Sequence, residues 1–238
     1  DAIGAPVATA GTGILDNGFT ANWNAVAGAT GYFLDVSTSP TFGQAATTMV
    51  GWDFEDSDDI ADSGFPANGS NQISTTADGP ITYTQGAGGT GNAITSEGWD
   101  GGNGTKYWMI SFATTGYNSL TVSSKQRSSN TGPEDFKIQY RIGTGDTWTD
   151  VPGGSITVAN NFSSGVVSAL ALPAACDNQA EVFLRWIMTS NQRVGSGNVA
   201  AGGTSRIDDI SIDAAAMPDY VTGYQDLSVA GTSQAVTG

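Results

Sequence analysis

Basic and aromatic side chains stand at strand spacing in the middle of this sequence, where they could bind a polar ligand. In the segment 136–142, Lys137, Gln139 and Arg141 alternate with apolar residues, and alternate residues of a strand share one face. Such a face can donate hydrogen bonds to a polyhydroxylated or acidic chain. The alternative is a solvated face that pairs with the surplus carboxylates, because an antiparallel sheet often has one polar face in any case.

Two further segments carry basic residues in the same alternation. Lys125 and Arg127 lie on one side of the preceding strand, and Arg185 lies opposite its neighbours Leu184 and Trp186. If these strands are neighbours in one sheet, five of the eight Lys and Arg residues of the chain meet on one face. Aromatic residues at the rim of that face could stack on the apolar faces of sugar rings. The candidates are Tyr107, Trp99 and Trp148.

Carboxylates form a second candidate site, for a metal ion. One cluster lies at 53–59 and another at 208–213. If the strands that carry them pair as first and last strands, the carboxylates approach each other and offer the oxygen ligands that Ca²⁺ prefers. The sequence holds no Asp-x-Asp-x-Asp-Gly loop, so solvated turn carboxylates in an acidic protein are the alternative.

The composition argues against several classes of function. The chain has no histidine, which removes the usual catalytic triads and the commonest general base. Nothing pairs Glu97, Glu134 or Glu181 as a glycosidase would require, so we predict that the protein is not an enzyme. A net charge of −15 repels nucleic acid. No apolar run reaches 18 residues, which predicts no membrane insertion. No basic segment followed by an apolar one is present as in a signal peptide, which a mature chain would have lost.

Short apolar segments separated by Gly-rich and Asn-rich turns predict an all-β protein. No stretch of twelve residues holds the period of a helix, whereas strand-length segments recur throughout 46–213. Their number and spacing indicate a two-sheet jelly-roll β-sandwich. The predicted strands are 49–54, 107–112, 120–124, 136–142, 155–158, 166–172, 182–188 and 207–212.

The flanking segments resemble a fibronectin type III (immunoglobulin-like) domain. The resemblance rests on Trp23, on the run Gly28-Ala29-Thr30-Gly31-Tyr32 and on later strands at 220–224 and 228–238. It implies a discontinuous domain, 1–45 and 214–238, interrupted by the jelly roll at 46–213. In that family two more strands follow, so this sandwich is predicted to be incomplete. Either the chain is a fragment of a longer protein, or a second chain completes the sandwich.

The inserted segment resembles the jelly-roll modules of secreted bacterial enzymes and adhesins, including carbohydrate-binding modules. The resemblance rests on the opening Trp52-Asp53-Phe54-Glu55 and the closing Arg206-Ile207-Asp208-Asp209-Ile210. It implies a non-catalytic module of a secreted or cell-surface bacterial protein that binds a polysaccharide or cell-surface glycan. It also implies a structural Ca²⁺ on Glu55 and Asp209, with Asp208 on the opposite face. The alternative function is a spacer or subunit of a surface adhesin or filament.

Overall fold

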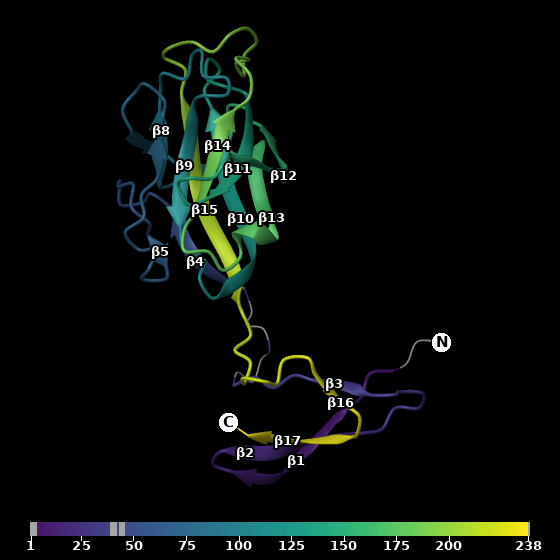
Figure 1. Ribbon diagram of the computed structural model, residues 1–238. Helices are drawn as coiled ribbons and strands as arrows, with labels where there is room; N and C mark the ends of the chain where they lie inside the picture. Colours follow the sequence, from purple (N-terminus) through teal and green to yellow (C-terminus); the bar gives the residue numbers. More distant parts are fainter. Residues whose placement is uncertain (1–3, 39–41, 43–45, 238) are drawn as a thin grey trace. The chain divides into compact units, whose positions relative to one another are not determined.

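The computed structural model describes residues 4–38, 42 and 46–237 and divides the chain into two compact units (Figure 1). The smaller unit combines Asp1–Gln44 with Met217–Gly238, and the larger unit is Ala45–Ala216. The predicted boundaries were 46 and 213, and residue 45 lies outside the described residues.

Two antiparallel sheets form the larger unit. One sheet has the order β13-β10-β15-β4-β5, and β8 pairs with both β15 and β7. Its strands are β4 Thr47–Trp52, β5 Ser63–Gly64, β7 Thr82–Gln85, β8 Asn92–Ser96, β10 Tyr117–Ser128, β13 Gly165–Ala171 and β15 Ser205–Ala216. The other sheet has the order β12-β11-β14-β9-β6. Its strands are β6 Ser74–Thr75, β9 Tyr107–Phe112, β11 Asp135–Ile142, β12 Thr149–Thr157 and β14 Val182–Met188. Two short 3₁₀ turns complete the elements, η1 Ala87–Gly89 and η2 Ala174–Cys176.

The alternation of side chains explains why the two sheets pack face to face. In β10 every second residue from Leu120 to Ser128 is buried, while Lys125 and Arg127 stay partly exposed. Val122 of β10 and Ile138 of β11 belong to one apolar core, which the inner faces of both sheets enclose. From β9 to β11, and again from β12 to β15, the chain passes from sheet to sheet as in a jelly roll.

The smaller unit is thinly packed. Its strands β1 Ala8–Leu15, β2 Gly18–Trp23 and β17 Ser233–Thr237 form one sheet in the order β1-β2-β17, and β3 Tyr32–Leu34 pairs with β16 Leu227–Val229. Among its described residues, the buried apolar side chains are Val36, Val229 and Val236. The rings of Trp23 and Tyr32 meet edge to face with centroids 5.7 Å apart. A unit with so small a core gains little from apolar burial.

Candidate functional site

Neighbouring strands bring six of the predicted ligand-binding residues onto the outer face of the β12-β11-β14-β9-β6 sheet. Gln139 lies directly across from Arg185, and Arg185 lies across from Met109 of β9. Trp148 precedes β12 and lies near the same face, in ring contact with Tyr107 at a centroid distance of 6.4 Å. We call this set the β11–β14 face; it consists of Lys137, Gln139, Arg141, Arg185, Tyr107 and Trp148.

Two arginines hold the Trp148 ring in place. The guanidinium carbon of Arg185 lies 4.1 Å from the Trp148 ring centroid and 5.0 Å from that of Tyr107. The guanidinium carbon of Arg141 lies 4.8 Å from the Trp148 centroid and 4.5 Å from that of Phe183. Each such cation–π contact contributes about 0.5–2 kcal/mol. The indole therefore sits in a fixed position on the sheet rather than free in solvent.

A hydrogen-bond relay orients Arg185. Its Nε and Nη2 atoms donate to Gln139 Oε1 at 2.9 and 2.6 Å. Gln139 Nε2 in turn donates to Asp150 Oδ1 at 2.6 Å, and Lys137 Nζ lies 2.8 Å from the same oxygen. The hydrogen bond from Lys137, followed by that from Gln139, lowers the pKa of Asp150. Burial lowers the pKa of Arg185, which nevertheless stays charged at neutral pH.

A pocket of about 260 Å³ opens beside Arg185. Ile187 and Met188 contribute apolar surface to it, while Lys137, Gln139 and Arg185 contribute polar groups. Its volume is just below the usual range for sites of small ligands, a size that suits one ring of a longer ligand. The lining combines apolar surface with hydrogen-bond donors, and a sugar ring offers CH groups on its faces and hydroxyls at its edge.

Lys125 and Arg127 do not join this face, contrary to the prediction. Both belong to β10, which pairs with β13 and β15 and not with β11. Because the inner faces of the two sheets enclose the core, the outward side chains of β10 lie on the opposite side of the sandwich. Lys125 Nζ makes an ion pair of 2.6 Å with Asp209, so its charge is already partnered.

Trp99 is part of the core and not of a binding rim, so that prediction is wrong. Its side chain is fully buried, and its ring packs against Trp108 and Phe136 with centroids 5.5 and 5.8 Å away. Its Nε1 donates to the backbone oxygen of Ser96 at 2.9 Å. This bond satisfies the polar end of the indole and makes full burial possible.

The predicted metal ligands lie differently from expectation. Strands β4 and β15 do pair, but Asp208 is buried, whereas Asp209 is exposed and bound to Lys125. A backbone φ of +46° at Asp209 interrupts the alternation of inward and outward side chains along β15 at these two residues. The loop 86–91 covers Asp208, whose Oδ2 accepts a hydrogen bond of 2.7 Å from the Ala87 amide. Asp208 Oδ1 accepts a second one of 2.8 Å from the Asp209 amide.

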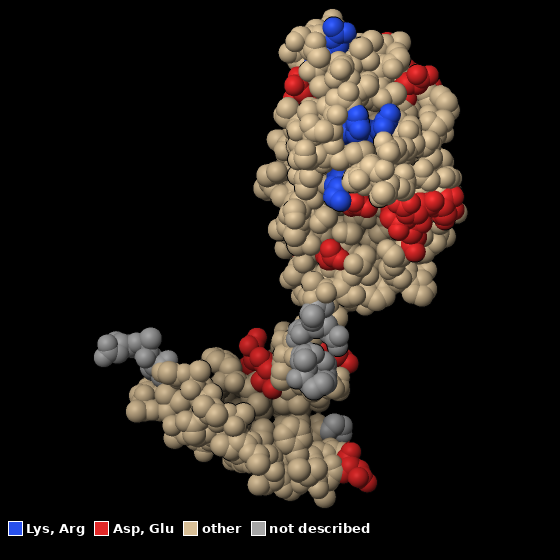
Figure 2. Space-filling view, turned by 180° about the vertical axis from the view of Figure 1, so that it is seen from behind, with Lys and Arg blue, Asp and Glu red and all other residues tan. Residues whose placement is uncertain are grey.

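Burial raises the pKa of Asp208 to about 6, and the charges of Asp209 and Glu55 add to the effect. Glu55 contacts the same loop, because its carboxylate occupies the space that a Cβ atom at Gly91 would need. Acidic side chains gather in one main patch on the face of the larger unit seen in Figure 2. Within the described residues, no group of three or more Asp, Glu, Cys or His is arranged to hold a metal ion.

Two of the carboxylates considered for catalysis, Glu134 and Glu181, are far apart. The Glu134 amide bonds to Gln192 at one end of the β11–β14 pair, and the Glu181 carbonyl bonds to Gly143 at the other. At the usual rise per residue these ends are roughly 25–30 Å apart, whereas a glycosidase pair needs about 5–10 Å. Glu97 follows β8 in the other sheet. Glu134 and Glu181 thus give no glycosidase geometry.

Comparisons with known proteins give similar all-β structures. The CBM22-1 xylan-binding domain of Xyn10C from Paenibacillus barcinonensis is 14% identical, with a TM-score of 0.44 over 72% of this chain and 96% of that domain. Domain 4 of the extracellular arabinanase AbnA from Geobacillus stearothermophilus, in complex with arabinotriose, is 14% identical, with a TM-score of 0.41 over 73% and 95%. The K1 cleaved adhesin domain of Lys-gingipain from Porphyromonas gingivalis is 14% identical, with a TM-score of 0.38 over 71% and 98%.

No protein-family model matches the sequence, and no curated protein matches it. The resemblance of the smaller unit to fibronectin type III is not confirmed by these comparisons and stays a prediction. The part of the chain that the structure describes contains no helix with the length and apolarity to cross a membrane.

Proposed function

We propose that this protein is a non-catalytic module that binds a polysaccharide or cell-surface glycan through the β11–β14 face. The observation that carries the proposal is the Trp148 ring, fixed by Arg185 and Arg141 next to a pocket with mixed apolar and polar lining. A fixed aromatic ring can stack on a sugar at little cost in side-chain entropy, because its orientation is already set. The charged groups beside it can bind hydroxyls or carboxylates.

A glycan array with the full chain tests this proposal. Wild type is compared with a Lys137→Ala, Arg141→Ala, Arg185→Ala variant and with Lys125→Ala, which removes a lysine from the opposite side of the sandwich. We expect the triple variant to lose binding and Lys125→Ala to retain it. If the wild type binds neither neutral nor acidic glycans on the array, the proposal is wrong. If both variants lose binding equally, the binding depends on the positive charge of the protein as a whole and not on this face.

Gln139 is expected to act through Arg185. Replacing Gln139 with leucine removes the acceptor of two Arg185 hydrogen bonds while keeping a similar volume. We expect about a fivefold loss of glycan affinity, since a lost hydrogen bond of this kind costs about 1 kcal/mol. Isothermal titration with a glycan from the array measures it. A matched Thr157→Val change on β12, away from Arg185, should leave the affinity within twofold.

We further propose that the protein acts outside the cell or on its surface, as part of a larger bacterial protein. Glycans that a binding module can anchor to are found there, and the acidic surface of the chain favours solubility. Fusion of the chain to a reporter, followed by cell fractionation of its bacterial source, tests this placement. Retention of the native protein inside the cell would contradict it.

We further propose that a structural Ca²⁺ binds between Glu55 and Asp208. Burial, followed by the charges of Asp209 and Glu55, raises the pKa of Asp208, and a bound cation would favour its ionised form. Asp209 is left out of this proposal because it pairs with Lys125. Two carboxylates are few for Ca²⁺, so backbone oxygens or water would have to supply the other ligands. The calcium experiment is described in the Discussion.

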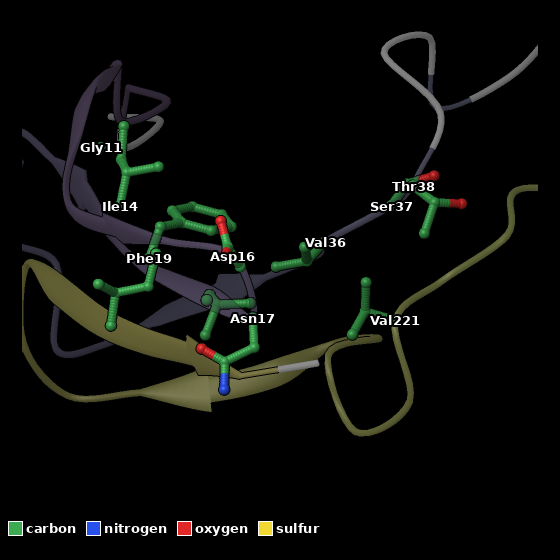
Figure 3. Close-up of a pocket in the computed structure, with 12 residues that line it drawn as sticks. Gly11, Ile14, Asp16, Asn17, Phe19, Val36, Ser37, Thr38 and Val221 are labelled. Atoms are coloured by element: carbon green, nitrogen blue, oxygen red, sulfur yellow. The ribbon is translucent and has the colours of Figure 1, made fainter.

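A second candidate function rests on the open groove of the smaller unit. A groove of about 710 Å³ lies between the β1-β2-β17 sheet and the chain around residues 36–38 and 221 (Figure 3), and Ile14, Phe19, Val36 and Val236 line it. Ile14 is 75% exposed. Among the described residues, β1 and β17 are each paired along one edge only, and Ile14 of β1 and Val236 of β17 line the groove. A free edge beside an apolar groove can accept an added strand, so further domains of the same protein, or a second chain, are proposed to complete this unit.

Self-association and dye binding test the groove. We expect Ile14→Asp to reduce fluorescence of the dye ANS and any dimer seen by light scattering, because it places a charge at the groove. Phe33→Asp is the matched control, since Phe33 is equally exposed but does not line the groove. A concentration-dependent dimer that only Ile14→Asp disrupts indicates that a second chain completes the smaller unit. A monomer that binds ANS indicates that further domains of the same protein complete it. Equal behaviour of both variants would contradict the groove as a docking site.

A further inference from the structure

A pair of arginines lies on the outer face of the β13-β10-β15-β4-β5 sheet, away from the β11–β14 face. Arg127 of β10 and Arg206 of β15 stand directly across from each other in the strand register. Each follows a buried residue, Gln126 or Ser205, and is itself partly exposed, so both side chains point outward. Like charges in directly opposed positions destabilise a sheet.

Neither arginine has a carboxylate partner. The ion pairs found among the described residues are Lys106–Asp78, Lys125–Asp209 and Lys137–Asp150. The chain has 23 Asp and Glu residues against 8 Lys and Arg, so an unpartnered arginine pair stands out. The nearby Asp208 points to the backbone amides of Ala87 and Asp209.

Both guanidinium groups keep unused donors. Arg127 Nη2 donates to Asn160 Oδ1, but Arg127 Nε is buried without a hydrogen-bond partner among the described residues. Within those residues, no hydrogen bond or ion pair involves the Arg206 guanidinium. Burial lowers the pKa of Arg206, and the charge of Arg127 adds to that effect. A buried donor without a partner is costly unless a solvent molecule or ligand satisfies it.

The surroundings hold Arg127 in place. Its guanidinium carbon lies 5.4 Å from the centroid of the Phe162 ring. Phe162 and Asn160 belong to the turn between β12 and β13, and Asn161 Oδ1 stabilises this turn by accepting hydrogen bonds of 3.0 and 2.8 Å from the amides of Ser163 and Ser164. The Arg127 side chain is thus fixed before any ligand arrives, which lowers the entropy cost of binding.

We infer that Arg127 and Arg206 form a site for an oxyanion, a sulfate or carboxylate group. Two guanidinium groups side by side offer the paired N–H donors that these anions accept. The anion would accept hydrogen bonds from the unused donors of Arg206 and cancel the repulsion between the two charges. The site is separate from the proposed glycan face, because the core of the sandwich lies between the two sheets. The oxyanion could be free or carried by an acidic polysaccharide, and the test below separates these sources.

The test uses the full chain and inorganic sulfate at low millimolar concentration, with chloride at equal ionic strength as reference. In wild type we expect sulfate to raise the unfolding midpoint Tm by about 2–4 °C and to shift the Arg127 Nε–H signal in ¹⁵N NMR spectra. Arg206→Gln should have an equal or higher Tm in chloride, because repulsion is removed, and should lose the sulfate effect. Arg193→Gln is the control, since Arg193 bonds to the backbone of Ser196 in another turn.

Each further outcome is informative. Equal effects of sulfate and chloride, or a sulfate response that survives Arg206→Gln, would overturn the inference. Affinity electrophoresis in dextran sulfate, polygalacturonate and neutral dextran then distinguishes the sources: retardation by the charged polymers alone indicates a polysaccharide-borne anion, and a response to inorganic sulfate alone indicates a free one. Trp148→Ala should keep the sulfate response, so failure of the proposed glycan face would leave this result unaffected.

Discussion

Trp148→Ala is expected to lower glycan affinity about 30-fold. The Trp148 indole is the largest side chain of the β11–β14 face, and Arg141 and Arg185 hold it in place. A fixed aromatic anchor of this kind contributes about 2 kcal/mol to binding. The loss should appear mainly as faster dissociation, because the charges that steer a ligand to the face are unchanged. Titration calorimetry with the best ligand from the array measures the affinity.

Trp148→Phe is the informative companion variant. It keeps an aromatic ring for stacking, so we expect it to recover most of the affinity that alanine loses. Circular dichroism should show that both variants keep the fold, because Trp148 lies outside the apolar core. Unchanged affinity in Trp148→Ala would contradict the role of this residue.

Stability is expected to fall as pH rises from 4 to 6.5, because of Asp208. Its pKa is raised from 3.8 to about 6 in the folded chain, so the folded state binds the proton more tightly than the unfolded state does. The contribution of the protonated form is complete below pH 4 and is lost as pH rises through 6. This shift corresponds to a loss of about 2–3 kcal/mol in the free energy of unfolding.

Urea denaturation in the presence of a chelator measures this effect. Wild type is compared with Asp208→Asn, which should lack this part of the pH dependence, and with Asp146→Asn, an exposed carboxylate in the turn between β11 and β12 of the other sheet, which should leave the slope unchanged. The comparison between variants cancels the repulsion that the net charge of −15 adds to every profile. Parallel profiles for wild type and Asp208→Asn would contradict the assignment.

Added Ca²⁺ turns the same experiment into a test of the proposed metal site. A cation bound to Glu55 and Asp208 would keep Asp208 ionised in the folded state, so millimolar Ca²⁺ should raise stability at pH 7.5 and flatten the wild-type slope. Glu55→Gln and Asp208→Asn should each remove the response. Identical profiles with Ca²⁺ and with chelator would exclude a stabilising ion there.

Apolar alternation is sufficient to find the central strands from the sequence. The segments 107–112 and 182–188 are β9 and β14 as the structure has them, because each is a long apolar run in which Trp108 or Trp186 points into the core. Strands β7 and β8 were missed, since Thr82–Gln85 and Asn92–Ser96 are mostly polar. β7 and β8 pair with each other, and β8 also pairs with β15. Such long-range pairing cannot be predicted from a local sequence pattern.

The site was predictable only where its residues share strands of one sheet. Alternation shows that Lys125 and Arg127 share a face of their strand, but it does not tell which sheet that strand joins. Trp99 lies between Gly98 and Asp100 without any period, so its burial could not be foreseen. Asp208, and not Asp209, is the carboxylate under the loop 86–91. This difference from the prediction depends on one backbone dihedral angle, the positive φ of Asp209.

NMR titration of the tryptophan indole N–H signals with the best array ligand tests the central claim most directly. Six tryptophans give six such signals, and Trp148→Phe assigns the one from the β11–β14 face. We predict that the Trp148 indole and the Arg185 Nε–H signals shift together and saturate at the same ligand concentration, while the buried Trp99 and Trp186 move little. Saturable shifts confined to other residues, such as Trp23 of the smaller unit, would contradict glycan binding at this face.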